Sequence, residues 1–154
     1  MVTKMNSYLG IADNDLMFLR AVPAVSMQSR YFNPIAIQSA QVVEKSLKAI
    51  AEIKLVDNDE INGLLRTSNL RKIAQALNSI DGIPQIDLVK CKFVGDFYFD
   101  VQYPGDDFIA VDYDTAVYCI ECAEEINRLA HEILDNRECH GMGMLPELKD
   151  LKFE

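Results

Sequence analysis

Glycine, proline and basic residues are all scarce in this chain of 154 residues. Seven glycines and five prolines are too few for a collagen-like or low-complexity sequence. Lysine and arginine number 15 against 24 acidic residues, which gives a net charge of −9. Because non-specific affinity for nucleic acid comes largely from lysine and arginine, this balance argues against a surface that follows an extended nucleic acid.

Long apolar runs are also missing. No window provides the roughly 18 apolar residues that a membrane-spanning helix requires, and no apolar stretch follows Lys4 as it does in a secretory signal peptide. We therefore expect a cytoplasmic protein that does not enter a membrane. Its four cysteines are expected to be reduced, because a chain of this length can bury a core without disulfides.

Apolar side chains recur with the spacing of helices. The clearest case is a helix over about 34–54, in which Pro34 follows a potential N-cap at Asn33. One stripe along this helix comprises Ala36, Ala40, Val43, Leu47 and Ile50, and a second stripe of mostly small residues comprises Ile35, Ser39, Val42, Ser46, Ala49 and Ile53. Two adjacent stripes predict contacts on two sides. The small residues allow close approach of another helix, either from the same chain or from a second copy.

Other segments predict further helices. A helix over about 7–22 buries Leu9, Ala12, Leu16 and Leu19, and two short helices occupy 57–80. A short helix and an irregular segment are expected over 85–104, and a long helix runs to about Asn136. The expected start signals are an Asp57–Glu60 capping box, Ser68 or Asn69 for the second short helix, and Asp114 for the long helix.

These segments predict an all-α fold. Three long amphipathic helices with short connections are typical of an antiparallel up-and-down bundle. We expect one helical domain over residues 1–140 and a C-terminal tail over residues 141–154.

The second predicted helix carries a sequence motif as well. Its residues 41–49, QVVEKSLKA, resemble the Q-x-A-E-K-x-L-K-A stretch of HEPN domains (higher eukaryotes and prokaryotes nucleotide-binding). Residues 67–73 stand where that family often has a His-Asp-Leu helix start. Tyr98 followed by QYPG at 102–105 is similar to the family's Y…R-Y-P-G/D signature. The resemblance covers about residues 7–135.

This resemblance implies a helical bundle of the HEPN type that is usually dimeric. Many family members pair with small nucleotidyltransferases as toxin–antitoxin couples. Some cut RNA without a metal through an R-x(4–6)-H motif, and others bind only nucleotides or partner proteins. In this chain no arginine stands five to seven positions before His131 or His140. The ribonuclease motif is therefore absent, and we assign no catalytic residue.

The leading hypothesis is a non-catalytic binding module that forms a homodimer and binds a protein partner. The resemblance suggests a nucleotidyltransferase as that partner, and the acidic balance of the chain favours a partner with a basic surface. The stripe of small residues on the second predicted helix is the sequence feature that suggests the dimer.

A nucleotide-binding module is the first alternative. Lys45 and Lys48 project from one side of a helix, and together with Arg71 they offer positive charge to a phosphate. An ordinary Glu44–Lys48 pair on a solvated face is the simpler interpretation. The candidate ligand-binding residues are Lys45, Lys48, Asn69, Arg71, Gln102 and Tyr103.

A divergent, metal-independent ribonuclease is the second alternative. Arg128 and His131 lie one helical turn apart, and an imidazole near a reacting group can serve as a general acid or base. A surface or interhelical histidine is the simpler interpretation. The sequence argues against an enzyme without deciding the question.

Cysteine and histidine near the C-terminus have the donor types of a zinc site. The candidates are Cys119, Cys122, Cys139 and His140. The first two lie within a predicted helix rather than on a turn, and cysteine often serves as a small buried apolar residue. We therefore assign no metal and no cofactor.

Overall fold

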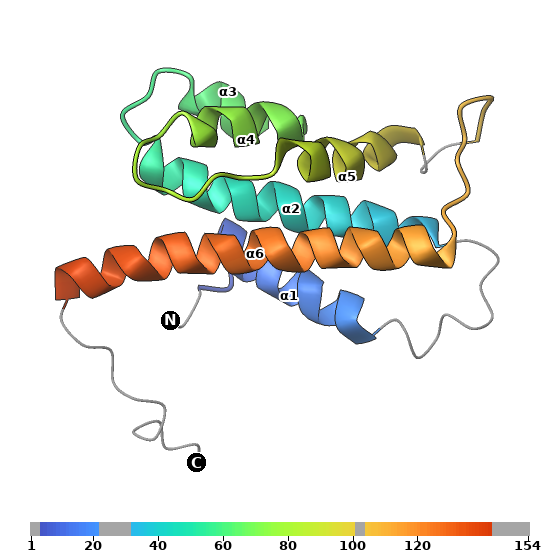
Figure 1. The fold of residues 1–154 in the computed structure, drawn as a ribbon, viewed down its shortest axis with the longest axis horizontal. Helices are drawn as coiled ribbons and strands as arrows, with labels where there is room; N and C mark the ends of the chain where they lie inside the picture. Colours follow the sequence, from blue (N-terminus) through green and yellow to red (C-terminus); the bar gives the residue numbers. More distant parts are fainter. Residues whose placement is uncertain (1–3, 22–31, 101–103, 143–154) are drawn as a thin grey trace, which may run out of the picture.

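The computed structural model describes residues 4–21, 32–100 and 104–142, and within these ranges it contains helices and no strand (Figure 1). The helices are α1 (Tyr8–Ala21), α2 (Asn33–Lys54), α3 (Ile61–Arg66), α4 (Leu70–Asn78), α5 (Leu88–Asp100) and α6 (Tyr113–Met142). This confirms the prediction of an all-α helical bundle. No helix in the described part of the chain is long and apolar enough to cross a membrane.

Helix α2 is the centre of the bundle and contacts α1, α3, α4, α5 and α6. Both of its predicted stripes are buried, apart from the half-buried Ile53. The small residues Ser39 and Ser46 are fully buried. The second stripe is thus covered by helices of the same chain, so it does not provide a surface for a second copy.

Helices α1, α2, α5 and α6 alternate in direction along the chain (Figure 1). Helix α1 runs antiparallel to α6, because Asp13 contacts His131 and Arg20 contacts Glu124. Helices α2 and α6 instead run parallel as neighbours (Figure 1), since Asn33 at the start of α2 bonds to residue 111 just before α6. The up-and-down order therefore holds along these four helices, while α2 and α6, two of the three long helices, are parallel neighbours.

Ser7, where the helix over 7–22 was predicted to start, lies just before Tyr8 and caps α1, a role that was not predicted. The Ser7 hydroxyl accepts a hydrogen bond from the Gly10 N–H at 3.0 Å, which satisfies one of the free donors of the first turn. A Cβ at Gly10 would lie 2.0 Å from the carbonyl oxygen of Lys4, so only glycine allows the preceding residues to fold back here. The four apolar residues predicted for this helix, Leu9, Ala12, Leu16 and Leu19, are buried as expected.

Asn33 is not the N-cap of α2. Phe32 occupies that position without a side-chain cap, and Asn33 is only 3 % exposed. Its side-chain amide donates to the carbonyl of Ile109 at 2.8 Å, and its Oδ1 accepts from the N–H of Val111 at 2.8 Å. Asn33 therefore ties the chain before α6 to the start of α2, a contact that local sequence cannot reveal.

Two of the other predicted start signals were wrong and one was right. Helix α6 is capped by Asp112 rather than Asp114, since the Asp112 carboxylate accepts the Thr115 N–H at 2.8 Å. A hydrogen bond from the Thr115 side chain, together with the one from its backbone N–H, lowers the pKa of Asp112. The Asp57–Glu60 box is absent, because Glu60 is the N-cap of α3 without a side-chain hydrogen bond. Asn69 caps α4 as predicted and accepts from the Lys72 N–H at 3.1 Å.

Helix α5 is longer than expected and continues to Asp100 where an irregular segment was predicted. Aromatic packing explains the difference. Phe93 lies edge-on to Phe97 at 4.9 Å between ring centroids and to Tyr118 of α6 at 5.0 Å, which stabilises the helical conformation. Helix α6 likewise extends past Asn136 to Met142. The predicted tail lies outside the described residues from residue 143 onward.

Asn33→Ala tests the contact between the start of α2 and residues 109–111. The substitution removes two hydrogen bonds, and it leaves the buried N–H of Val111 and the part-buried carbonyl of Ile109 without these partners. We expect the free energy of unfolding in urea to fall by about 1–3 kcal/mol. Asn62→Ala, at an exposed position of α3, is the matched control and should change it by less than about 0.5 kcal/mol. Equal stability of the two variants would contradict this role.

Candidate functional site

The two lysines predicted to hold a phosphate are both paired with carboxylates. Lys45 Nζ lies 2.8 Å from Asp15 Oδ2 of α1, and Lys48 Nζ lies 2.6 Å from Glu44 Oε1 one turn earlier on α2. Lys48 is only 6 % exposed. A buried ammonium needs such a partner, because an unpaired buried charge is costly. The Glu44–Lys48 pair therefore exists, with Lys48 buried and Glu44 half-buried rather than both on a solvated face.

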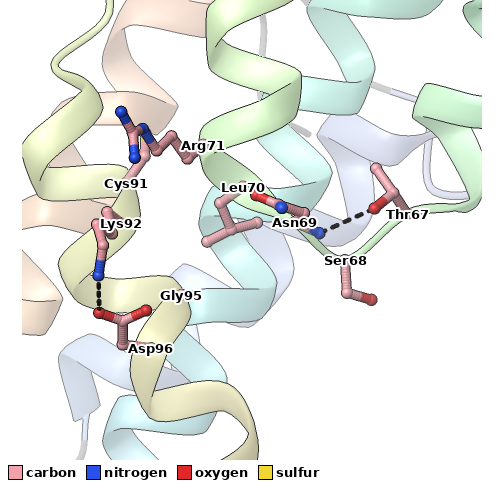
Figure 2. A pocket seen from close by; sticks show the side chains of 9 residues that line it. All are labelled: Thr67, Ser68, Asn69, Leu70, Arg71, Cys91, Lys92, Gly95 and Asp96. Carbon is pink, nitrogen blue, oxygen red and sulfur yellow. Dashed lines mark hydrogen bonds and ion pairs between the residues drawn. The ribbon is translucent and has the colours of Figure 1, made fainter.

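Two other predicted ligand-binding residues, Asn69 and Arg71, lie together in a cavity of about 560 Å³ between the start of α4 and α5 (Figure 2). Its walls are formed by residues 67–71 from one side and by Cys91, Lys92, Gly95 and Asp96 of α5 from the other. Lys45 and Lys48 do not line this cavity. Gln102 and Tyr103 lie outside the described residues. The structure thus brings together only part of the predicted set.

Local hydrogen bonds shape the α4 side of this cavity. The Thr67 hydroxyl accepts from the Asn69 N–H at 3.1 Å, and the Asn69 side chain caps the helix. Figure 2 shows Arg71 extending from α4 toward α5, where Cys91 and Lys92 lie. The Leu70 side chain lies next to Gly95 of α5. A Cβ added at Gly95 would lie 3.5 Å from the Leu70 side chain.

The α5 side of the cavity was missed by the sequence analysis. Lys92 and Asp96 form an i,i+4 ion pair with a separation of 2.6 Å, and this spacing is visible in the sequence. No local feature of the sequence, however, indicates that α5 lies along the start of α4. Cys91 is 1 % exposed, and burial raises the pKa of its thiol to about 12. At neutral pH this thiol is protonated and is therefore not a nucleophile.

His131, the histidine of the ribonuclease alternative, lies between α1 and α6. Its Nε2 is 2.8 Å from Asp13 Oδ1, and the same oxygen accepts the Asn127 side-chain amide at 2.9 Å. Asn127 is buried and also lies 3.4 Å from the Ser46 hydroxyl of α2. Arg128 is exposed on α6. His131 is therefore an interhelical histidine with a carboxylate partner, and this polar network joins three helices.

The described cysteines Cys91, Cys119 and Cys122 are buried and free. Burial raises the pKa of Cys119 to about 12, and burial is also the main cause that raises the pKa of Cys122. The side chains of Cys139 and His140 lie outside the described part. Among the residues that the structure does describe, no three histidine, cysteine or acidic side chains are grouped to hold a metal ion.

A sequence model of the HEPN domain matches residues 23–134 of the chain. This range includes α2, the cavity between α4 and α5, and the α6 residues Asn127 and His131. No curated protein and no solved structure is significantly similar to the chain.

A double-mutant cycle with Asp13→Ala and His131→Ala tests the interhelical contact. Since the two side chains are in direct contact and half-buried, we expect their effects on the free energy of unfolding to be coupled by about 0.5–3 kcal/mol. The exposed Lys92–Asp96 pair provides the control cycle, with an expected coupling of about 0.3–0.5 kcal/mol. Additive effects of the first pair would show that Asp13 and His131 do not stabilise each other.

Alkaline pH should destabilise the fold through its buried thiols. In the folded chain, burial raises the pKa of the Cys119 thiol to about 12, whereas its ordinary pKa is 9.0. Stability from this thiol is fully present below pH 9 and is lost as the pH rises toward 12, because only the unfolded chain releases the proton. In urea unfolding from pH 8 to 10.5, Cys119→Ala should lose stability less steeply than the wild type. Parallel slopes would contradict the assignment.

Proposed function

We propose that this chain, which belongs to the HEPN domain family, is a non-catalytic binding module that contacts other proteins through the outer face of α1. The observation that carries the proposal is the exposure of large apolar side chains on that face. Phe18 is 62 % exposed, Met17 59 % and Ile11 38 %, although the opposite face of α1 is buried. The exposed Asn14 lies between Ile11 and Phe18 along the helix, so this face combines apolar side chains with a polar one. Several large apolar side chains exposed on one helix face are typical of an interaction surface.

A second copy of the chain is the proposed occupant of this face. Ile11 and Phe18 are seven residues apart and therefore lie on one side of the helix. Two α1 helices related by a twofold axis would cover these side chains with each other. With a net charge of −9 on each copy, the interface has to be mainly apolar, because charged surfaces of the same sign repel.

The rest of the acidic surface supports a second, heterologous partner with a basic surface, and a nucleotidyltransferase is our candidate. Opposite charges raise the rate of association and disfavour wrong partners. Membership in a toxin–antitoxin couple and a cytoplasmic location stay predictions from the sequence.

The two alternatives have weaker support. Nucleotide binding through Lys45, Lys48 and Arg71 stays a prediction, and the carboxylates beside both lysines reduce the charge that they offer to a phosphate. The ribonuclease alternative lacks the R-x(4–6)-H motif, and the Nε2 atom of His131 already contacts Asp13.

Phe18→Ser tests the α1 interface by sedimentation velocity at micromolar concentrations. We expect the wild type to be a dimer and the variant to dissociate with a Kd at least tenfold higher, because a buried aromatic residue often dominates an interface. Val89→Ser is the matched control, since Val89 is 77 % exposed on α5 and should leave the dimer unchanged. A wild type that remains monomeric, or equal effects of the two substitutions, would refute the proposal.

A further inference from the structure

We propose that residues 105–114, which lead into α6 and form its start, are a docking surface for a basic segment of another protein, in which lysine or arginine residues flank apolar ones. This assignment rests on the proposed role of the chain in binding other proteins, and it gives the basic partner a place and a chemistry. The surface lies at the end of the bundle where α2 and α6 begin (Figure 1).

The backbone of this surface is fixed against the start of α2. Asn33 bonds to the carbonyl of Ile109 and to the N–H of Val111, each at 2.8 Å. The Phe32 N–H donates to the Val111 carbonyl at 2.9 Å, and the Phe32 ring meets the Tyr113 ring edge-on at 5.6 Å between centroids. A surface that is already ordered loses less conformational entropy when a partner docks.

Large apolar side chains stay exposed on this anchored segment. Tyr113 is 50 % exposed, Ile109 43 % and Phe108 41 %, although Val111 between them is buried. Ile109 and Tyr113 both lie beside the start of α2. Exposed apolar side chains gathered in one place are typical of an interaction surface, and aromatic residues are enriched in protein interfaces.

The charged side chains of the same segment are all acidic. Asp106, Asp107, Asp112 and Asp114 are exposed, and residues 105–114 include no lysine, arginine or histidine. Four aspartates without a cation therefore surround the apolar side chains with negative charge. Such a surface attracts a cationic partner and repels an acidic one.

Two other occupants fit this surface less well. In a twofold dimer the surface would face itself, so the aspartates of both copies would repel each other. A single divalent ion needs several carboxylates grouped closely, and the acidic side chains in the described ranges include no group of three that could hold a metal ion. Spread charges around apolar side chains instead match a peptide that carries both features.

The surface is separate from the face of α1 proposed for the dimer. Helix α1 packs farther along α6, because Arg20 contacts Glu124 and Asp13 contacts His131. Peptide binding and dimerisation can therefore be measured as two different properties of the full chain.

Fluorescence anisotropy with labelled peptides tests the docking surface. The first peptide places leucines between lysines, the second replaces each leucine with serine, and the third replaces each lysine with glutamate. At physiological ionic strength we expect a micromolar Kd for the first peptide, at least about fivefold weaker binding of the second, and no binding of the third. Absence of binding to the first peptide, or equal binding of the first two, would overturn the proposal.

Ile109→Ser and Val56→Ser test the apolar part of the surface. Both remove an exposed apolar side chain, but Val56, which is 64 % exposed, lies just past the other end of α2. Ile109→Ser should raise the Kd of the first peptide about fivefold or more, and Val56→Ser should change it less than about twofold. Thermal unfolding checks that both variants fold. Equal effects of the two substitutions would rule out this surface.

Paired asparagine variants test the charges. Asp106→Asn with Asp107→Asn should raise the Kd of the first peptide about threefold or more. Asp57→Asn with Asp59→Asn makes the same change in net charge at exposed positions after α2, and its effect should be less than half as large. Equal losses would show attraction to the overall charge of the chain and would sink the assignment.

Sedimentation velocity separates this assignment from the α1 interface. Ile109→Ser should sediment as the wild type does, and Phe18→Ser should bind the first peptide with an unchanged Kd. Loss of the dimer in Ile109→Ser would place a second copy on residues 105–114 and overturn the docking of a basic segment. A monomeric wild type that binds the peptide as expected would refute the α1 interface and support the docking surface.

Discussion

The side chains of α2 are buried around nearly the whole helix, and the rest of the bundle is arranged to meet that requirement. From Val42 to Ala51 every residue is buried except the half-buried Glu44 and Lys45. A helix that is covered on all sides needs neighbours on all sides, and each of the other helices contacts α2. The same burial explains why Lys48 has Glu44 beside it, since a lone ammonium inside the bundle would cost several kcal/mol.

The polar contacts of the interior connect the helices that surround α2. Asp13 accepts from Asn127 and contacts His131, which fixes α1 against α6. At the other end of α6, Asn33 holds the backbone of residues 109 and 111. Asn33 and Asn127 are buried and have partners, and such groups favour one packing arrangement because a shift between helices would leave a partner missing. The parallel neighbours α2 and α6 are thus held in register by side-chain amides at two levels.

These structural demands determine which side chains remain free for binding. The cations on α2 already have carboxylate partners, and His131 is engaged by Asp13. The exposed apolar side chains on α1 and the guanidinium of Arg71 beside the α4–α5 cavity are among the described side chains that have no such contact. Helices α1 and α4 lie on opposite sides of α2 (Figure 1).

The sequence by itself determined where the helices form, which faces they bury and which family the chain resembles. Helical periodicity and the Asn69 cap are local properties, since they depend on side chains within one or two turns. Only the tertiary structure decided that Asn33 bonds to residues 109–111, that α5 continues through Phe97 because Tyr118 packs on Phe93, and that Arg71 faces α5 rather than Lys45 and Lys48. Each of these depends on residues far apart in the chain, and neither spacing nor composition specifies which helix becomes the neighbour of another.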